Sequence, residues 1–197
     1  MFGKRIILAG MSTLINLISL SHSRHCQTEF AGEFSRNTSA GIQEDVELMS
    51  VLIRKARHSS KYGRAWKNYY HDLVVFLRAR FGEQPIEVIE IGTCFGGNAH
   101  SILSSIPSST VHVIDPFLPN YDHSDSISRK FEGITHERNL SHSQFSHLWA
   151  EALFSEMTTR FSCRYHLHHK MSTDAAVDFP NNFAHAIFVD GLHTYEG

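Results

Sequence analysis

The feature that most constrains the fold is an alternation of short β-branched runs with helical stretches from residue 86 onward. The run Ile86–Ile91 (IEVIEI) predicts a strand, and residues 97–106 predict a helix directly after it. Further strands are expected at 111–114, 165–170 and 186–189, separated by helical stretches at 143–161 and 173–177. Strand and helix in alternation imply βαβ units, so the sequence predicts an α/β fold with a doubly wound parallel sheet.

Apolar residues at helical spacing predict two amphipathic helices before the first of these strands, within residues 43–84. Gly82 and Pro85 are expected to end the second helix, because glycine suits a helix C-cap and proline cannot continue a helix. The segment 116–141 is long, polar and weakly patterned. Loops of that length in compact domains are usually functional, so an inserted loop beside the site is expected there.

The N-terminus has the layout of a targeting segment over residues 1–25. Lys4 and Arg5 precede an apolar run that ends at Leu20, and this run is shorter than the roughly twenty residues of a bilayer span. A signal peptide is favoured, with the secretory pathway or the extracellular space as destination; an organellar transit peptide and a short membrane anchor remain alternatives. Residues 26–42 predict a polar linker with a glycosylation sequon at Asn37, and 43–197 the folded domain.

Charge and cysteine usage exclude several classes of protein. The net charge is -2, so there is no basic surplus to neutralise a phosphate backbone and no nucleic-acid partner is expected. The cysteines number 3 and form no C-x-x-C pair, which excludes a disulfide framework or thiolate zinc site and leaves room for one bridge. His166, His168 and His169 suggest a metal site, but strand alternation sends the last two to opposite faces.

Residues at strand ends carry the candidate site, because ligands of such sheets bind outside the carboxyl ends of the strands. Glu90 lies late in the first strand, and Gly92 and Gly96 permit a tight turn before the next helix. A dinucleotide fingerprint would require glycine at Cys94, and no Gly-Lys-Ser/Thr phosphate loop is present. Glu90 can instead hold an ammonium group, and Asp115 at the end of VHVID can accept hydrogen bonds from ribose hydroxyls.

The segments IEVIEIGTCFGGNAHSIL, VHVIDPF and AIFVDGLHTYEG resemble, in order and spacing, the class I S-adenosylmethionine-dependent methyltransferases, in particular the small-molecule O-methyltransferase-like branch with a D-G-x-H-x-Y-E motif. The resemblance covers about residues 85–197 and implies a Rossmann-like fold. It implies a turn around the methionine part of the cofactor, a ribose-binding acid, and a loosely matched position near the adenine. The corresponding residues are Glu90, Gly92, Thr93 and Gly96 for the turn, Asp115 for the ribose, and Ser172 and Asp174 for the adenine.

Asp190 and His193 are the candidates for the reaction itself. In the family that the chain resembles, the acid at this position binds a divalent cation such as magnesium, which activates a substrate hydroxyl. His193 is either a general base or part of the adenine pocket. The other interpretation is a loop that closes over the cofactor without catalysis.

The expected activity is methyl transfer to a small hydroxylated or sugar-like acceptor. The family fold has further strands after the fourth, and the chain stops just beyond it, so three hypotheses are open. The chain is a fragment of an active methyltransferase, a cofactor-binding module without catalysis, or a secreted or tethered interaction protein that retains the half fold.

Overall fold

The sheet is the centre of the molecule. The computed structural model describes the backbone of residues 6–7, 40–58 and 60–191. Its five-stranded sheet has the order β1-β5-β2-β3-β4, and the four strands from β2 to β5 run parallel. The strands are β1 (Ile6–Ile7), β2 (Ile86–Ile91), β3 (Ser109–Ile114), β4 (Tyr165–His168) and β5 (Ala186–Val189). This arrangement confirms the predicted α/β, Rossmann-like fold.

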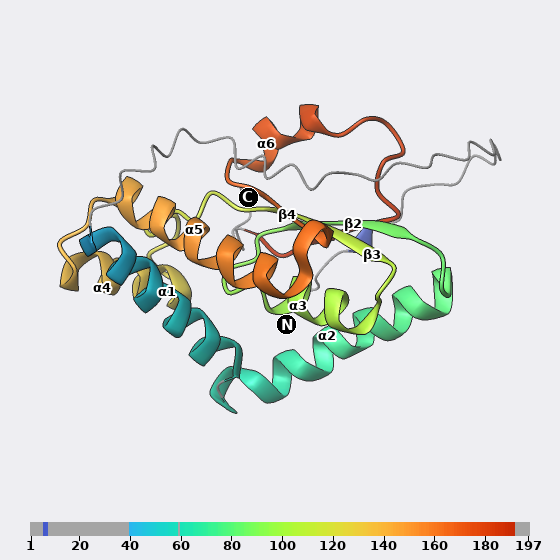
Figure 1. The fold of residues 1–197 in the computed structure, drawn as a ribbon, viewed down its shortest axis with the longest axis horizontal. Helices are drawn as coiled ribbons and strands as arrows, with labels where there is room; N and C mark the ends of the chain where they lie inside the picture. Colours follow the sequence, from blue (N-terminus) through green and yellow to red (C-terminus); the bar gives the residue numbers. More distant parts are fainter. Residues whose placement is uncertain (1–5, 8–39, 59, 192–197) are drawn as a thin grey trace.

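Helices cover the two faces unequally (Figure 1). In the part of the chain that the structure describes, the helices α1 to α5 lie on one side of the sheet, and the short α6 and the 3-10 turn η2 lie on the other. The first group contains α1 (Ala40–His58), α2 (Ser60–Phe81), α3 (Gly97–Ser105), α4 (Ser126–Glu137) and α5 (His142–Phe161). The remaining elements are η1 (Ser162–Arg164), α6 (Ser172–Ala175) and η2 (Ala176–Asp178).

The chain winds outward and then returns. From β2 through β3 to β4, the strands advance in one direction, with α3 and then α4 and α5 in the connections. The connection through α6 then crosses the other face and brings β5 back beside β2. The strand order therefore reverses between β2 and β5, which is the topological switch point where open α/β sheets bind ligands.

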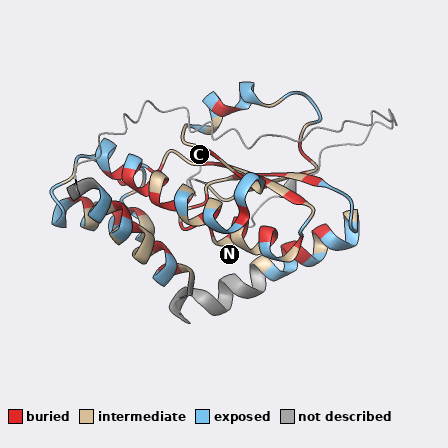
Figure 2. Ribbon diagram, viewed as in Figure 1, coloured by how far each residue is buried: buried red, intermediate tan, exposed pale blue. Residues whose placement is uncertain are grey.

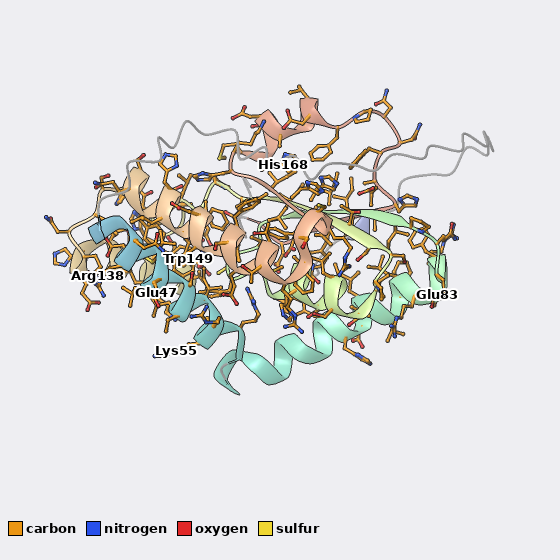
Figure 3. The ribbon with its side chains drawn as sticks, in the orientation of Figure 1. Glu47, Lys55, Glu83, Arg138, Trp149 and His168 are labelled. Carbon is orange, nitrogen blue, oxygen red and sulfur yellow. The ribbon has the colours of Figure 1, made fainter. Side chains whose placement is uncertain are left out.

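Successive side chains along a strand point to opposite faces of the sheet and pack into two separate hydrophobic cores. Val88 packs into the large core under the helices, whereas its neighbour Ile89 belongs to a small cluster on the α6 face. Buried residues line the inner faces of α1, α3 and α5 in Figure 2. Trp149 of α5 is fully buried in the large core, and Figure 3 shows it in the helix layer.

Residues 116–141 differ from the prediction of a continuous loop. Helix α4 occupies Ser126–Glu137, and the Asp125 side chain caps its N-terminus by accepting from the backbone N–H groups of Ile127 and Ser128. Its buried residues, Ser128, Phe131 and Thr135, have helical spacing. Ile127 and Ile134 are partly buried and pack against the large core on either side of Phe131, so apolar residues do recur at helical spacing, but polar and charged residues surround them in the sequence.

The predicted end of α2 is confirmed. The helix ends at Phe81, and Gly82 follows with φ 61 and donates its N–H to the Arg78 carbonyl at 2.8 Å. This left-handed conformation is the one that favours glycine after a helix.

β1 lies within the segment predicted to be a targeting sequence. Ile6 and Ile7 pair antiparallel with Phe188 and Ile187 of β5, at the edge that a sheet of four strands would leave open. The rest of the predicted leader and the linker with Asn37 lie outside the described residues. None of the described helices combines the length and the apolar composition that a membrane crossing requires.

Candidate functional site

The candidate site lies where the carboxyl ends of β2, β3 and β5 converge. Backbone hydrogen bonds extend the pairing past the last strand residues, since Gly92 donates to the Ile114 carbonyl at 2.9 Å and Asp190 donates to the Ile91 carbonyl at 2.8 Å. Gly92, Asp115 and Asp190 thus follow adjacent strands directly. The structure brings these three predicted site residues together at the switch point.

Gly92 cannot be replaced by a residue with a side chain without a change in the backbone. Its φ is 80, and a Cβ placed there would lie 2.5 Å from the Asp190 carbonyl oxygen and 2.5 Å from the Cα of Gly191. Gly96 has φ 70, and a Cβ there would lie 2.8 Å from a Leu153 methyl carbon. Both predicted turn glycines are therefore required by conformation, and Gly92 is also required by space.

Cys94 adopts the left-handed conformation that glycine favours, with φ 54. The sequence suggested that a cysteine here breaks the glycine pattern, but the backbone follows the path that a glycine would take. The side chain is a half-buried free thiol that packs against the large core. Burial, followed by the nearby charge of Asp115, raises the pKa of this thiol well above its ordinary value.

The Asp115 carboxylate holds the N–H side of the turn. Its Oδ2 accepts from the backbone N–H groups of Thr93 at 2.8 Å and Cys94 at 3.1 Å, and its Oδ1 accepts from the Phe117 N–H at 2.8 Å. Burial raises the pKa of Asp115, and the three N–H donors oppose that effect. A carboxylate offers about four lone-pair positions, so about one remains for a ligand.

Two residues that the sequence did not reveal hold the carbonyl side of the turn. The Trp149 indole N–H donates to the Cys94 carbonyl at 2.9 Å. The Arg57 guanidinium donates to the Phe95 carbonyl through Nη2 at 3.0 Å and Nε at 3.3 Å. Both come from helices distant in sequence, so no local spacing could have indicated them. Backbone N–H groups and backbone carbonyls of the turn therefore both have side-chain hydrogen-bond partners.

Beneath the turn lie buried polar groups without hydrogen-bond partners. Glu90 is 2 % exposed, and its Oε2 has no partner. Both amide atoms of Asn98 and the Tyr165 hydroxyl also have none. Desolvation, followed by the charge of Asp190, raises the pKa of Glu90 to about 8. Groups of this kind cost stability unless something binds them, so they mark a place where a polar ligand or water fits.

No protein-family model, curated protein or solved structure matches this chain. The function must therefore be inferred from the geometry and from the sequence motifs.

Ser172 and Asp174 are less closely joined to this centre. They lie in α6, whose buried Ala175 packs with the small cluster on the opposite face from α3 and α5. Asp190, which follows β5 beside the turn, is half-buried, and His193 lies outside the described residues.

The structure separates the histidines as strand alternation predicts. His168 lies toward the α6 face (Figure 3), where its ring contacts Phe179 at 5.0 Å between centroids. His169 faces the helix layer, where its Nε2 lies 2.7 Å from the Ser146 hydroxyl. Within residues 40–58 and 60–191, no group of three or more His, Cys, Asp or Glu side chains is arranged to hold a metal ion.

Proposed function

We propose that this chain binds S-adenosylmethionine at the switch point and transfers its methyl group to the hydroxyl of a small acceptor. The observation that carries the proposal is the Glu90 carboxyl, buried below a glycine-rich turn with one oxygen unpartnered. An ammonium group is the partner that such a carboxyl lacks, and it would stabilise the ionised form. The cofactor supplies that ammonium and, when bound, an electrophilic methyl group on a sulfonium.

Each part of the site has a role in this proposal. Glu90 and the Thr93 hydroxyl hold the amino-acid end, and Gly92 and Gly96 let the ligand approach the backbone closely. Asp115 accepts from the ribose through its remaining lone pair, so one ribose hydroxyl rather than both is the expected partner. Ser172 and Asp174 are proposed for the adenine side.

Asp190 is proposed to take the proton of the acceptor hydroxyl. The hydroxyl oxygen then bonds to the methyl carbon as the carbon–sulfur bond of the cofactor breaks. Asp190 follows β5 directly, beside the turn, and is half-buried. His193 is the alternative base in this scheme. Asp190 is also the residue proposed to hold a divalent cation such as magnesium, which would lower the pKa of the acceptor hydroxyl.

The secretory pathway is the proposed destination. Cys163 is disulfide-bonded, and structural disulfides persist in oxidising compartments. A tagged full-length chain that enters the secretory pathway would acquire the glycan at Asn37, which a glycosidase-sensitive mass shift would reveal; a chain that stays in the cytosol without a glycan contradicts this destination.

Calorimetry with S-adenosylmethionine tests the binding step on the full chain. The variant Glu90→Gln keeps the shape of the side chain but removes the charge, and it should raise the Kd by about tenfold or more, as expected for a hydrogen bond to a charged group. Asp115→Asn should also weaken binding. Glu47→Gln, on the exposed surface of α1, is the matched control and should bind as the unmodified chain does.

Transfer of a labelled methyl group to small hydroxylated compounds tests the chemical step. Binding without transfer to any acceptor would favour the non-catalytic module. A folded chain that binds no cofactor would contradict both and favour the interaction protein. Methylation of nucleic acid would contradict the proposed acceptor class.

A further inference from the structure

A cluster of imidazoles and phenyl rings lies on the α6 face of the sheet. The His112 ring of β3 stacks on the His166 ring of β4, with 4.7 Å between centroids and 10° between planes. Phe183 meets His112 at 4.9 Å, and Phe179 meets His168 at 5.0 Å. The cluster therefore joins two strands to the segment that follows β4.

Within this cluster, a continuous series of polar contacts runs from Glu87 through His112 and His168 to Asp178. His112 Nε2 lies 3.1 Å from Glu87 Oε2, and His112 Nδ1 lies 3.4 Å from His168 Nε2. His168 Nδ1 lies 3.5 Å from Asp178 Oδ2, which also pairs with Lys170 Nζ at 2.6 Å. All four ring nitrogens of the two histidines thus face a partner.

A count of protons shows what this chain of contacts requires. With both carboxylates ionised, the nitrogens that face Glu87 and Asp178 must each carry a hydrogen. Two neutral imidazoles then leave two lone pairs facing each other in the gap between His112 and His168. One additional proton fills that gap with an N–H···N bond, whereas a second additional proton would place two N–H groups and two positive charges against each other.

We propose that His112 and His168 form a one-proton site that holds the segment from Lys170 to Asp178 against the sheet, and that a second proton releases this segment. The site binds the proton as one unit, because neither ring satisfies its contacts alone. Release exposes the His168 ring to water, where a second positive charge costs much less.

The electrostatic surroundings support this direction. Burial, followed by the His112 charge, lowers the pKa of His168, while Asp178 opposes the effect and Lys170 adds to it. His185, on the other side of β2, accepts a hydrogen bond from the Glu87 N–H through Nδ1, so this nitrogen carries no proton. The stacked His166 ring is the remaining titratable group of the cluster.

The sign follows from linkage. The pKa of His168 is lower with the segment attached than in water, where the ordinary value is 6.5. The released form therefore binds more protons, and acidification below this value favours release. Ser172 and Asp174 belong to this segment and move with it. If the proposed function is correct, acid would therefore open the adenine side of the site; the release of the segment itself does not depend on that function.

Hydrogen exchange of the α6 amides tests the proposal on the full chain. The Ala175 N–H, which bonds to the Met171 carbonyl at 2.9 Å, reports on attachment. Its protection factor, corrected for intrinsic exchange, should fall by up to about tenfold per pH unit below about pH 6.5. A protection factor that is constant from about pH 7.5 to about pH 5 would overturn the proposal.

Variants separate the switch from general acid destabilisation. His168→Gln cannot take the second proton and should remove the acid dependence of the protection factor at Ala175. The protection factors of amides in the central strand β3 should depend on pH as they do in the unmodified chain. His112→Gln removes the neighbouring charge and should weaken the dependence. The exposed His136→Gln on α4 is the control and should leave it unchanged. Acid release that persists in both His168→Gln and His112→Gln would contradict the proposal.

Discussion

The Glu90 carboxyl makes the stability of the fold depend on pH in a way that one substitution can remove. Glu90 is 2 % exposed, and its pKa is raised from an ordinary 4.5 to about 8. The folded protein therefore holds this proton more tightly than the unfolded chain does. As the pH rises from 4.5 towards 8, the unfolded chain releases the proton first, so the free energy of unfolding decreases.

The size of the effect follows from the same values. Each pH unit within that interval lowers the free energy of unfolding by about 1.4 kcal/mol. Glu90→Gln keeps the shape and has no proton to lose, so it should lack this slope. Between about pH 5 and about pH 7, the stability of Glu90→Gln relative to the unmodified chain should increase by roughly 2–3 kcal/mol.

Denaturant unfolding at a series of pH values, followed by the fluorescence of buried Trp149, would measure this difference. Glu47→Gln, which changes an exposed carboxyl on α1, should give a curve parallel to that of the unmodified chain. If the curve for Glu90→Gln is also parallel, Glu90 does not hold a proton in the folded state and the reasoning is refuted.

Three other results are expected. Cofactor binding should tighten as the pH rises towards 8 because an ammonium needs ionised Glu90, and calorimetry in buffers of different ionisation enthalpy should detect proton release; binding without release would contradict this. Gly92→Ala should lower the free energy of unfolding by about 2 kcal/mol or more, whereas Gly133→Ala, in open space on α4, should raise it by about 0.5–1 kcal/mol; similar values in chemical denaturation would argue against the close approach. Trp149→Phe should cost about 1–3 kcal/mol by leaving a turn carbonyl unpaired, and a thermal melt without any loss would exclude that role.

The sequence was most informative where structure depends on neighbouring residues. Runs of β-branched residues located β2, β3 and β5, because strands inside a parallel sheet are rich in such residues. β4 (YHLH) has none and was located by its alternation and its place in the order of elements. Gly82 marked the end of α2 because its conformation suits glycine. The helix α4 was missed although Ile127, Phe131 and Ile134 recur at helical spacing, because polar and charged residues outnumber them and the cap at Asp125 resembles an ordinary polar loop.

The site was only partly accessible to sequence reasoning. Glu90, Gly92 and Asp115 could be placed because each follows or ends a strand, and strand ends meet at one edge of a parallel sheet. Arg57 and Trp149 could not, since their partners are far away in sequence and depend on how helices pack. The left-handed φ of Cys94 was hidden as well, because a cysteine rarely adopts it.

The glycine-rich turn has its backbone groups bonded on both sides before any ligand is present. The Asp115 carboxylate holds two of its N–H groups, and Trp149 and Arg57 hold two of its carbonyls. A loop fixed in this way loses little conformational entropy when it takes up a ligand, because its order already exists. Association at this site should therefore be a single-step encounter, with selectivity expressed mainly in how slowly a fitting molecule departs.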